Sequence, residues 1–242
     1  MKTQTISEII FIFHFEFMMQ LKILQGINGA KKAKETAVII DVFRASSTII
    51  ACLHNESKKI IPVESVEKAF LLKEKYPSWI LVGERNGKKI DGFDYGNSPS
   101  TMASLYLKDK TIILSTSSGT KGIINAENTD ECLIASFTNI SKVISYLREK
   151  NKEKISIIPM GLNATTPAIE DDLCAEYILK SLQNKHIEYP KMIKQIKQSK
   201  GYQRLQRLKQ HQDMPYCLQI NRFPLVPVYI KEKQTKQPII RC

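Results

Sequence analysis

The sequence predicts an α/β protein, with three layers in which a largely parallel sheet, mixed at its edge, lies between helices. Short apolar runs of four to seven residues alternate with segments of helical periodicity, which is typical of strands buried on both faces. Polar residues follow several of these runs, at the carboxyl ends of strands, where such sheets bind ligands. With 242 residues, 43% of them hydrophobic, we expect residues 1–242 to form a single domain.

An apolar segment at residues 9–19, IIFIFHFEFMM, precedes the regular pattern. His14 and Glu16 interrupt it, no small-residue cleavage site follows it, and it is too short to span a bilayer. We therefore expect residues 1–18 to be an N-terminal extension or an extra strand. No later segment is long and apolar enough to be transmembrane, so no membrane partner is expected.

The segment Ala37–Ile50, AVIIDVFRASSTII, is the centre of the pattern. A continuous apolar run ends at Asp41, and a helix is expected to follow over residues 46–54. The first turn of such a helix offers free N–H groups and the positive end of its dipole to an anion. Asp41 and Arg44 therefore lie where we expect an anionic ligand to bind.

Further strands and helices follow in alternation. Strands are expected at Lys59–Val63, Trp79–Val82, Thr111–Leu114, 132–136 and Ile155–Met160. Helices are expected after the capping residue Ser65, over 121–127 and 139–150, and after Thr166 and Pro167. In the last of these helices, the residues expected to face inward are Ile169, Leu173, Ile178 and Leu182. Between the strands, residues 83–101 predict a long functional loop.

The C-terminal part, residues 190–242, has a different character. Residues 191–209 hold seven basic side chains and no acidic one, and their apolar spacing predicts a pair of surface helices broken near Gly201. The tail from Pro224 predicts an edge strand, because prolines are excluded from the centre of a sheet.

Composition narrows the classes of function. The formal net charge of +12 favours anionic partners, although lysines spread along the whole chain also fit a solvated basic surface. The five cysteines are widely spaced and form no C-x-x-C pair, so neither a zinc site nor a disulfide framework is indicated, and we expect a cytoplasmic protein. The four histidines fall outside the polar junctions, which argues against Ser-His-Asp or Cys-His catalysis.

Polar side chains follow five of the expected strands. They are Asp41 with Arg44, Glu84 with Arg85, the run 115–120, Ser136 with Asn139, and Gly161 with Asn163. Because the carboxyl ends of parallel strands meet at one edge of a sheet, we expect these groups to converge. The segment STSSGTKG fits a phosphate cradle, in which hydroxyls donate and Gly119 lets the backbone turn, but it also fits an ordinary strand-to-helix turn.

Carboxylates supply the other half of the predicted site. Asp41 fits a metal ligand, a nucleophile or a general base, and equally a helix cap or the partner of Arg44. Three acidic residues at 170–172 complement a helix dipole, and together with Asp41 and Glu84 they would form an oxygen-rich site suited to Mg²⁺. The cations expected to meet a multiply charged substrate are Arg44, Arg85, Lys88, Lys89 and Lys121.

Five ordered blocks resemble a known family. They are DVFRASSTI (41–49), GERNGKKIDGFDYGNSP (83–99), STSSGTKGI (115–123), SFTNIS (136–141) and EDDLCAEYIL (170–179), with a weaker likeness over 199–230. They resemble the 2-phosphosulfolactate phosphatase family of coenzyme M biosynthesis. The resemblance implies a three-layer α/β fold and Mg²⁺-dependent hydrolysis of 2-phospho-3-sulfolactate to 3-sulfolactate and phosphate. A related phosphorylated acid stays open as the substrate.

The family's motif positions suggest a set of site residues, to which we assign roles. The expected catalytic residues are Asp41, Arg44 and Arg85. The expected substrate-binding residues are Asn86, Asn97, Ser98, Ser117, Ser118, Gly119 and Thr120. The expected metal ligands are Asp41, Glu84, Glu170 and Asp171.

Two other hypotheses stay open. A haloacid-dehalogenase-type phosphatase would form an aspartyl-phosphate intermediate on Asp41, but that family has a second Asp two positions on, where this chain has Phe43. A nucleic-acid-binding protein would use the basic segment 191–209, which has no aromatic residue except Tyr202. The favoured partner is a small anionic phosphorylated substrate, with no nucleic acid, and the chain could also form a homo-oligomer.

Overall fold

The structure is a computed structural model that describes residues 19–231 and 238–242, so the expected extension at 1–18 lies outside the described residues. It confirms the α/β class. Within the described residues, ten strands form a mixed, mostly parallel sheet in the order β1-β8-β2-β7-β9-β10-β3-β6-β4-β5. The strands are β1 (Gln20–Ile23), β2 (Glu35–Ile40), β3 (Lys59–Pro62), β4 (Ile80–Arg85), β5 (Lys88–Lys89), β6 (Thr111–Ser115), β7 (Thr129–Ala135), β8 (Lys154–Pro159), β9 (Val228–Lys231) and β10 (Pro238–Arg241).

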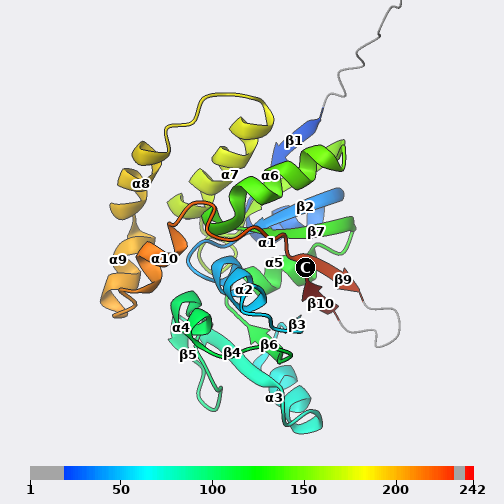
Figure 1. The fold of residues 1–242 in the computed structure, drawn as a ribbon, viewed down its shortest axis with the longest axis vertical. Helices are drawn as coiled ribbons and strands as arrows, with labels where there is room; N and C mark the ends of the chain where they lie inside the picture. Colours follow the sequence, from blue (N-terminus) through cyan, green and yellow to red (C-terminus); the bar gives the residue numbers. More distant parts are fainter. Residues whose placement is uncertain (1–18, 232–237) are drawn as a thin grey trace, which may run out of the picture.

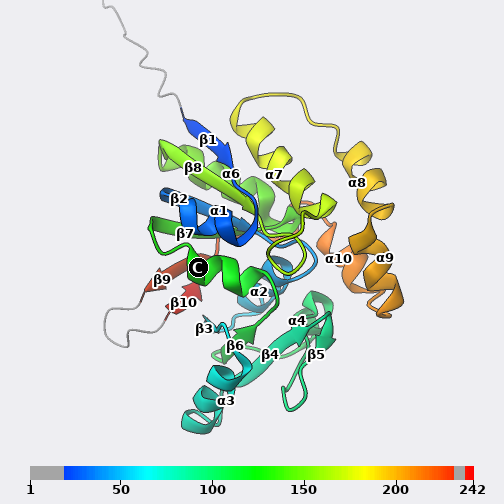
Figure 2. The same ribbon diagram turned by 180° about the vertical axis from the view of Figure 1, so that it is seen from behind.

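Helices cover both faces of this sheet. Figure 1 shows α6 and α7 in front of the sheet, and Figure 2 shows α1 and α5 on the opposite face. A short 3₁₀ turn, Phe137–Asn139, precedes α6. The helices are α1 (Gly26–Lys32), α2 (Ala45–His54), α3 (Val66–Lys75), α4 (Pro99–Ser104), α5 (Gly119–Asn125), α6 (Ile140–Glu149), α7 (Ile169–Leu182), α8 (Tyr189–Lys197), α9 (Lys200–Arg207) and α10 (Asp213–Cys217).

Strand β2 shows why its sequence is a continuous apolar run. Successive side chains of a strand point to opposite faces of the sheet. Ala37 and Ile39 accordingly join a core cluster with α1, α2 and α5, while Val38 and Ile40 join a second cluster with α6 and α7. Because both faces are covered, no position in the run from Ala37 to Ile40 can be polar without leaving an unpaired group in a core.

The C-terminal hairpin joins two parallel halves of the sheet. Strands β1, β8, β2 and β7 pair with one another in parallel, and so do β3, β6 and β4. Strand β9 pairs antiparallel with β7, and β10 pairs antiparallel with β3. The expectation of an edge strand after Pro224 was therefore wrong. The paired residues begin at Val228, after the prolines, and the carbonyl of Pro227 still accepts a hydrogen bond from Ile134.

The expectation of a long loop also needs correction. The segment 83–101 is not all loop, because β4 runs to Arg85, β5 pairs back on it, and α4 begins at Pro99. Ser98 caps α4 by accepting the N–H of Thr101, and Pro99 occupies the first turn, a signal that the sequence did contain. The pair of helices expected over residues 191–209 is present as α8 and α9, and the break lies at residues 198–199, near Gly201, which is the second residue of α9.

Helix α7 begins later than expected. Its first residue is Ile169, which is 48% exposed and does not face inward, whereas Ile178 and Leu182 are buried as expected. The reason is that Ile169 lines an open cavity, whereas the next two residues of the same turn, Glu170 and Asp171, are buried. Within residues 19–231 and 238–242, no helix is long and apolar enough to cross a membrane.

Candidate active site

The ends of four strands surround a cavity of about 760 Å³. Asp41 follows β2, Glu84 lies in β4, Ser117 and Ser118 follow β6, and Gly161 follows β8, and all of them line it. Four of the five polar junctions expected to converge therefore reach one cavity. In the fifth, Ser136 and Asn139 are buried and cap the 3₁₀ turn after β7.

Asp41 is both a helix cap and a residue of the cavity. Its Oδ1 atom accepts the N–H of Ala45 at 3.1 Å, and its carboxyl group also accepts the N–H of Gly119, so it lies at the N-termini of α2 and α5. The pKa of Asp41 is raised to about 7, mainly by burial and also by the charge of Glu84, while the hydrogen bond from Ala45 acts to lower it. A carboxyl group in these surroundings favours any cation or proton that neutralises it.

Arg44 pairs with Asp213 rather than with Asp41. Its Nη1 atom donates to Asp213 Oδ2 at 2.7 Å and to Gln210 Oε1 at 2.9 Å, and Nη2 donates to the carbonyl of Gly87 at 3.0 Å. Arg44 is 4% exposed and Asp213 is 1% exposed. The guanidinium is therefore fixed at the cavity wall by the C-terminal part of the chain.

Asp213 is a residue that the sequence reasoning missed. Its Oδ1 atom accepts hydrogen bonds from Ser98 Oγ at 2.7 Å and from the Ser100 backbone N–H at 3.1 Å. It thus connects α10, α4 and Arg44. The signal that could have found it is its isolation, because it is the one acidic residue between positions 189 and 231, and a lone carboxylate among so many cations is a natural ion-pair partner.

Glu84 and Asp171 each connect two of the strand ends. Glu84 accepts the N–H of Ser117 at 2.7 Å and of Gly87 at 2.6 Å, one on each carboxylate oxygen. Asp171 accepts the N–H of Val42 at 2.7 Å and of Gly161 at 2.8 Å. These charge-assisted bonds stabilise the loops that form the cavity.

The pKa of Asp171 is raised well above the usual range for an aspartic acid. The largest cause is burial, and the charges of Asp41 and Glu170 add to it. Asp171 therefore adds to the concentration of acidic groups at this end of the cavity.

Glu170 connects the cavity to α9. Its Oε2 atom accepts a hydrogen bond from Ser199 Oγ at 3.3 Å. Burial raises the pKa of Glu170, while the hydrogen bond from Ser199 and the charge of Arg204 lower it. Gly201 packs so closely on this carboxylate that a Cβ atom there would overlap Glu170 Oε1.

The donor atoms of the cavity are of the type that Mg²⁺ prefers, since the acidic residues expected as ligands, Asp41, Glu84, Glu170 and Asp171, all line it. Asn97 also lines it, and its buried Oδ1 atom has no hydrogen-bond partner within the described part of the chain. An unpartnered carbonyl oxygen of this kind is suited to a water molecule, a ligand or a cation. Among residues 19–231 and 238–242, no three His, Cys, Asp or Glu side chains form a ready-made metal cage. Mg²⁺ commonly uses one or two carboxylates with water and substrate phosphate, so the residues fit it.

Several expected site residues lie beside the cavity rather than on its wall. Arg85 turns away, and its guanidinium donates to the Glu84 carbonyl at 2.7 Å and to Ser115 Oγ at 2.9 Å. Thr120 donates to the carbonyl of Thr116. Asn86, with a φ of 54°, forms the turn between β4 and β5, and Ser98, the cap of α4, donates to Asp213.

The turn at Ser118 and Gly119 is formed by close backbone packing. A Cβ atom on Gly119 would lie 2.5 Å from the Cβ of Ala45 and 2.9 Å from Asp41 Oδ2, so only glycine allows α5 to approach Asp41. Ser118 lines the cavity, and its Oγ accepts the N–H of Ala164 at 3.1 Å. The expected cradle therefore brings α5 and the loop after β8 to the same place.

The cations of the cavity come largely from a segment that the sequence reasoning placed on the surface. Lys200, Arg204 and Arg207 of α9 line it, whereas Lys88, Lys89 and Lys121 are not among its lining residues. Figure 1 shows α8, α9 and α10 following one another along one side of the molecule, next to α7 and α4. No local pattern predicts this placement, because the contacts join residues far apart in the chain, such as Arg204 of α9 and Gly87 in the turn after β4.

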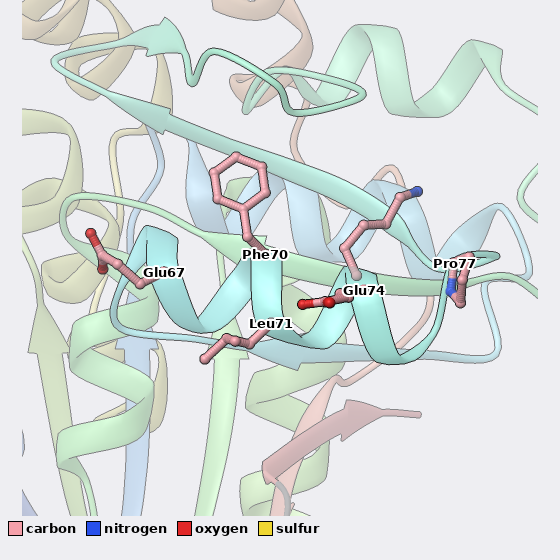
Figure 3. Close-up of a pocket in the computed structure, with 6 residues that line it drawn as sticks. Glu67, Phe70, Leu71, Glu74 and Pro77 are labelled. Carbon is pink, nitrogen blue, oxygen red and sulfur yellow. The ribbon is translucent and has the colours of Figure 1, made fainter.

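A second hollow lies along α3, away from α7 and α9 in both views (Figures 1 and 2). Figure 3 shows its lining, which is formed by Glu67, Phe70, Leu71, Lys73, Glu74 and Pro77. None of these was an expected site residue, and Phe70 packs edge-on against Phe93 of the core, with ring centroids 5.5 Å apart. The candidate site is therefore the cavity at the strand ends.

The fold and the cavity define an α/β protein with a candidate ligand site, at the carboxyl edge of the sheet, that combines buried carboxylates with guanidinium groups. The family described as 2-phosphosulpholactate phosphatase matches residues 22–232. A "Probable 2-phosphosulfolactate phosphatase" of Clostridium perfringens is 36% identical over 209 residues, which cover 78% of this chain and 84% of that protein. One of Caldanaerobacter subterraneus is 31% identical over 235 residues, covering 87% and 94%. The chain belongs to the 2-phosphosulfolactate phosphatase family.

Proposed function

We propose that the protein is a Mg²⁺-dependent phosphatase that hydrolyses 2-phospho-3-sulfolactate, or a related small phosphorylated acid, to the hydroxy acid and phosphate. The observation that carries the proposal is the juxtaposition of Asp41 with Arg44 and the α9 cations around one cavity. Metal-assisted phosphoryl transfer needs acidic oxygens for a cation and positive groups for the phosphoryl oxygens. The names of the relatives supply the substrate.

The residues of the chain have separate tasks in this proposal. Arg44, held by Asp213, presents fixed positive charge to the phosphoryl group, so little reorganisation is needed as charge develops. Ser117 and Ser118, just before α5, line the cavity and offer hydroxyl donors, since the backbone N–H of Ser117 already binds Glu84. Asn97, with its unpartnered Oδ1, is available to orient the attacking water or the substrate.

Mg²⁺ would be held by some of Asp41, Glu84, Glu170 and Asp171, and when bound it would polarise the phosphoryl group and lower the pKa of a water molecule. Asp41 is the strongest candidate, because burial raises its pKa to about 7 and a neighbouring cation would relieve that cost. Attack by water is favoured over attack by Asp41, since the position two residues on is occupied by the aromatic Phe43 at the cavity wall.

A phosphate-release screen tests the function. Phosphorylated three-carbon acids, including 2-phospho-3-sulfolactate, would be incubated with the protein with and without Mg²⁺. We expect release that falls at least about tenfold after chelation and returns when Mg²⁺ is added back. Release that survives chelation would contradict the metal-dependent mechanism, and no release from any of these acids would contradict the function.

The basic segment supports this function better than nucleic-acid binding, because Lys200, Arg204 and Arg207 face the cavity that holds Asp41. A salt-dependent shift of random RNA or DNA at submicromolar protein would contradict this assignment. We place the enzyme in the cytoplasm, a proposal supported by its widely spaced cysteines.

A further inference from the structure

Arg204 differs from the other basic residues of the cavity. Its side chain is half-buried, while Lys200 and Arg207 are exposed. Within the described part of the chain, its guanidinium makes no hydrogen bond and no ion pair, and its interaction with Glu170 is electrostatic at longer range. A guanidinium that loses water without gaining a bonded partner is costly, unless a ligand supplies the missing acceptors.

The position of Arg204 relates it to Arg44. Both side chains lie against Gly87, since Arg44 Nη2 donates to the Gly87 carbonyl and Arg204 Nη2 lies 3.2 Å from the place that a Cβ on Gly87 would occupy. Arg44 already has Asp213 and Gln210 as acceptors. The cavity wall therefore carries two guanidinium groups beside the same turn, one fixed by the protein and one without a bonded partner.

We propose that Arg204 is a specificity-determining residue that binds a second acidic group of the substrate, a carboxylate or a sulfonate, while the phosphoryl group lies at Arg44. This inference rests on the proposed function. A planar guanidinium matches either acidic group with two parallel hydrogen bonds. A phosphate ester without a second acidic group leaves Arg204 desolvated and unpaired, so the enzyme selects phosphorylated acids over simple phosphate esters.

Three substrates test this selection. They are p-nitrophenyl phosphate, which has no second acidic group, 2-phospholactate, which has a carboxylate, and 2-phospho-3-sulfolactate, which has both. The measurement is kcat/KM for each, in the wild type, in Arg204→Gln and Arg204→Lys, and in Lys197→Gln. The last is a matched control, because it removes an exposed positive charge of α8 that does not line the cavity.

In Arg204→Gln we expect the ratio of kcat/KM for a phosphorylated acid to that for p-nitrophenyl phosphate to fall about tenfold to a hundredfold, mainly through KM. Arg204→Lys keeps the positive charge but cannot make two parallel hydrogen bonds, so in this variant the ratio should fall less. A fall for both acids identifies the carboxylate as the contact, and a fall for the sulfolactate ester alone identifies the sulfonate. Lys197→Gln should keep the wild-type ratio.

Equal losses on all three esters, or no change of the ratio, would overturn the inference and leave the proposed function intact. If the wild type hydrolyses none of the three, the proposed function fails and the inference fails with it. Product inhibition supplies a second measurement, because it reports on binding and does not require the variant to hydrolyse a phosphorylated acid. We expect the inhibition constant of 3-sulfolactate to rise in Arg204→Gln by more than that of inorganic phosphate. A parallel rise of both constants would contradict the assignment.

Discussion

At the scale of single residues, the ion pair between Arg44 and Asp213 joins an expected site residue to one that no sequence motif predicted. Both side chains are almost fully buried, and Asp213 also accepts hydrogen bonds from Ser98 and Ser100. The attraction between two buried opposite charges offsets the cost of removing both from water, and this attraction is lost when either charge is removed. Removing Asp213 therefore leaves Arg44 charged and without its acidic partner.

We expect Asp213→Ala to lower the free energy of unfolding by about 3–5 kcal/mol. Urea unfolding would measure this, with Asp130→Ala as the control, because Asp130 is exposed. The double variant Arg44→Met/Asp213→Leu should recover part of the loss, since it leaves no unpaired charge. With the single variants Arg44→Met and Asp213→Leu also measured, a double variant whose loss equals the sum of their two losses would show that the pair does not interact.

The other residue-scale prediction concerns Asp41. Asp41→Asn keeps the size of the side chain and removes the charge, and we expect kcat/KM to fall on the order of a hundredfold or more, the size typical of one lost electrostatic or proton-transfer group. Phosphate release from 2-phospho-3-sulfolactate measures this, with Asp130→Asn as the control. Undiminished phosphate release in Asp41→Asn would show that Asp41 has no role in the reaction.

At the scale of elements, α7 and α9 meet through Glu170 and Gly201. Alanine normally stabilises a helix relative to glycine, by about 0.5–1 kcal/mol. At Gly201, however, the new Cβ atom would overlap the Glu170 carboxylate, which is the end of a flexible side chain. The carboxylate can therefore move without unfolding the protein, and its displacement is the expected effect.

We expect Gly201→Ala to lower phosphatase activity about tenfold or more while the free energy of unfolding stays within about 1 kcal/mol of the wild type, because the helix gains what the contact loses. The control is Gly96→Ala, where the nearest atom to the new Cβ lies 3.5 Å away. In a Glu170→Ala background, Gly201→Ala should cost no further activity. Full activity of the single variant would mean that the position of Glu170 does not matter.

At the scale of the whole molecule, the sequence predicts those features that depend on residues close together in the chain. The apolar runs of β2, β3, β6, β7 and β8 and the polar residues after them are local signals, and they located most of the cavity. Partners that lie far apart along the chain leave no such signal. Arg44 and Asp213 are separated by 169 positions, and the central place of β9 depends on its pairing with Cys132 and Leu133. Prolines beside β9 suggested an edge, because sequence alone does not show that the pairing begins after them.

The central hairpin leads to a prediction about cooperativity. Ile240 of β10 is fully buried and pairs with Ile60 of β3, so it links the hairpin to the half of the sheet that contains β4 and β6. The chain has one tryptophan, Trp79, which directly precedes β4 and reports on that half, while circular dichroism reports on the whole. In the wild type we expect the two signals to change together in urea.

Ile240→Ala should lower the free energy of unfolding by about 2–5 kcal/mol and shift both transitions equally, whereas Arg241→Ala, at an exposed position, should shift neither. If the fluorescence transition of Ile240→Ala came first and separated from the other, the two halves would be independently stable, and the hairpin would only connect them.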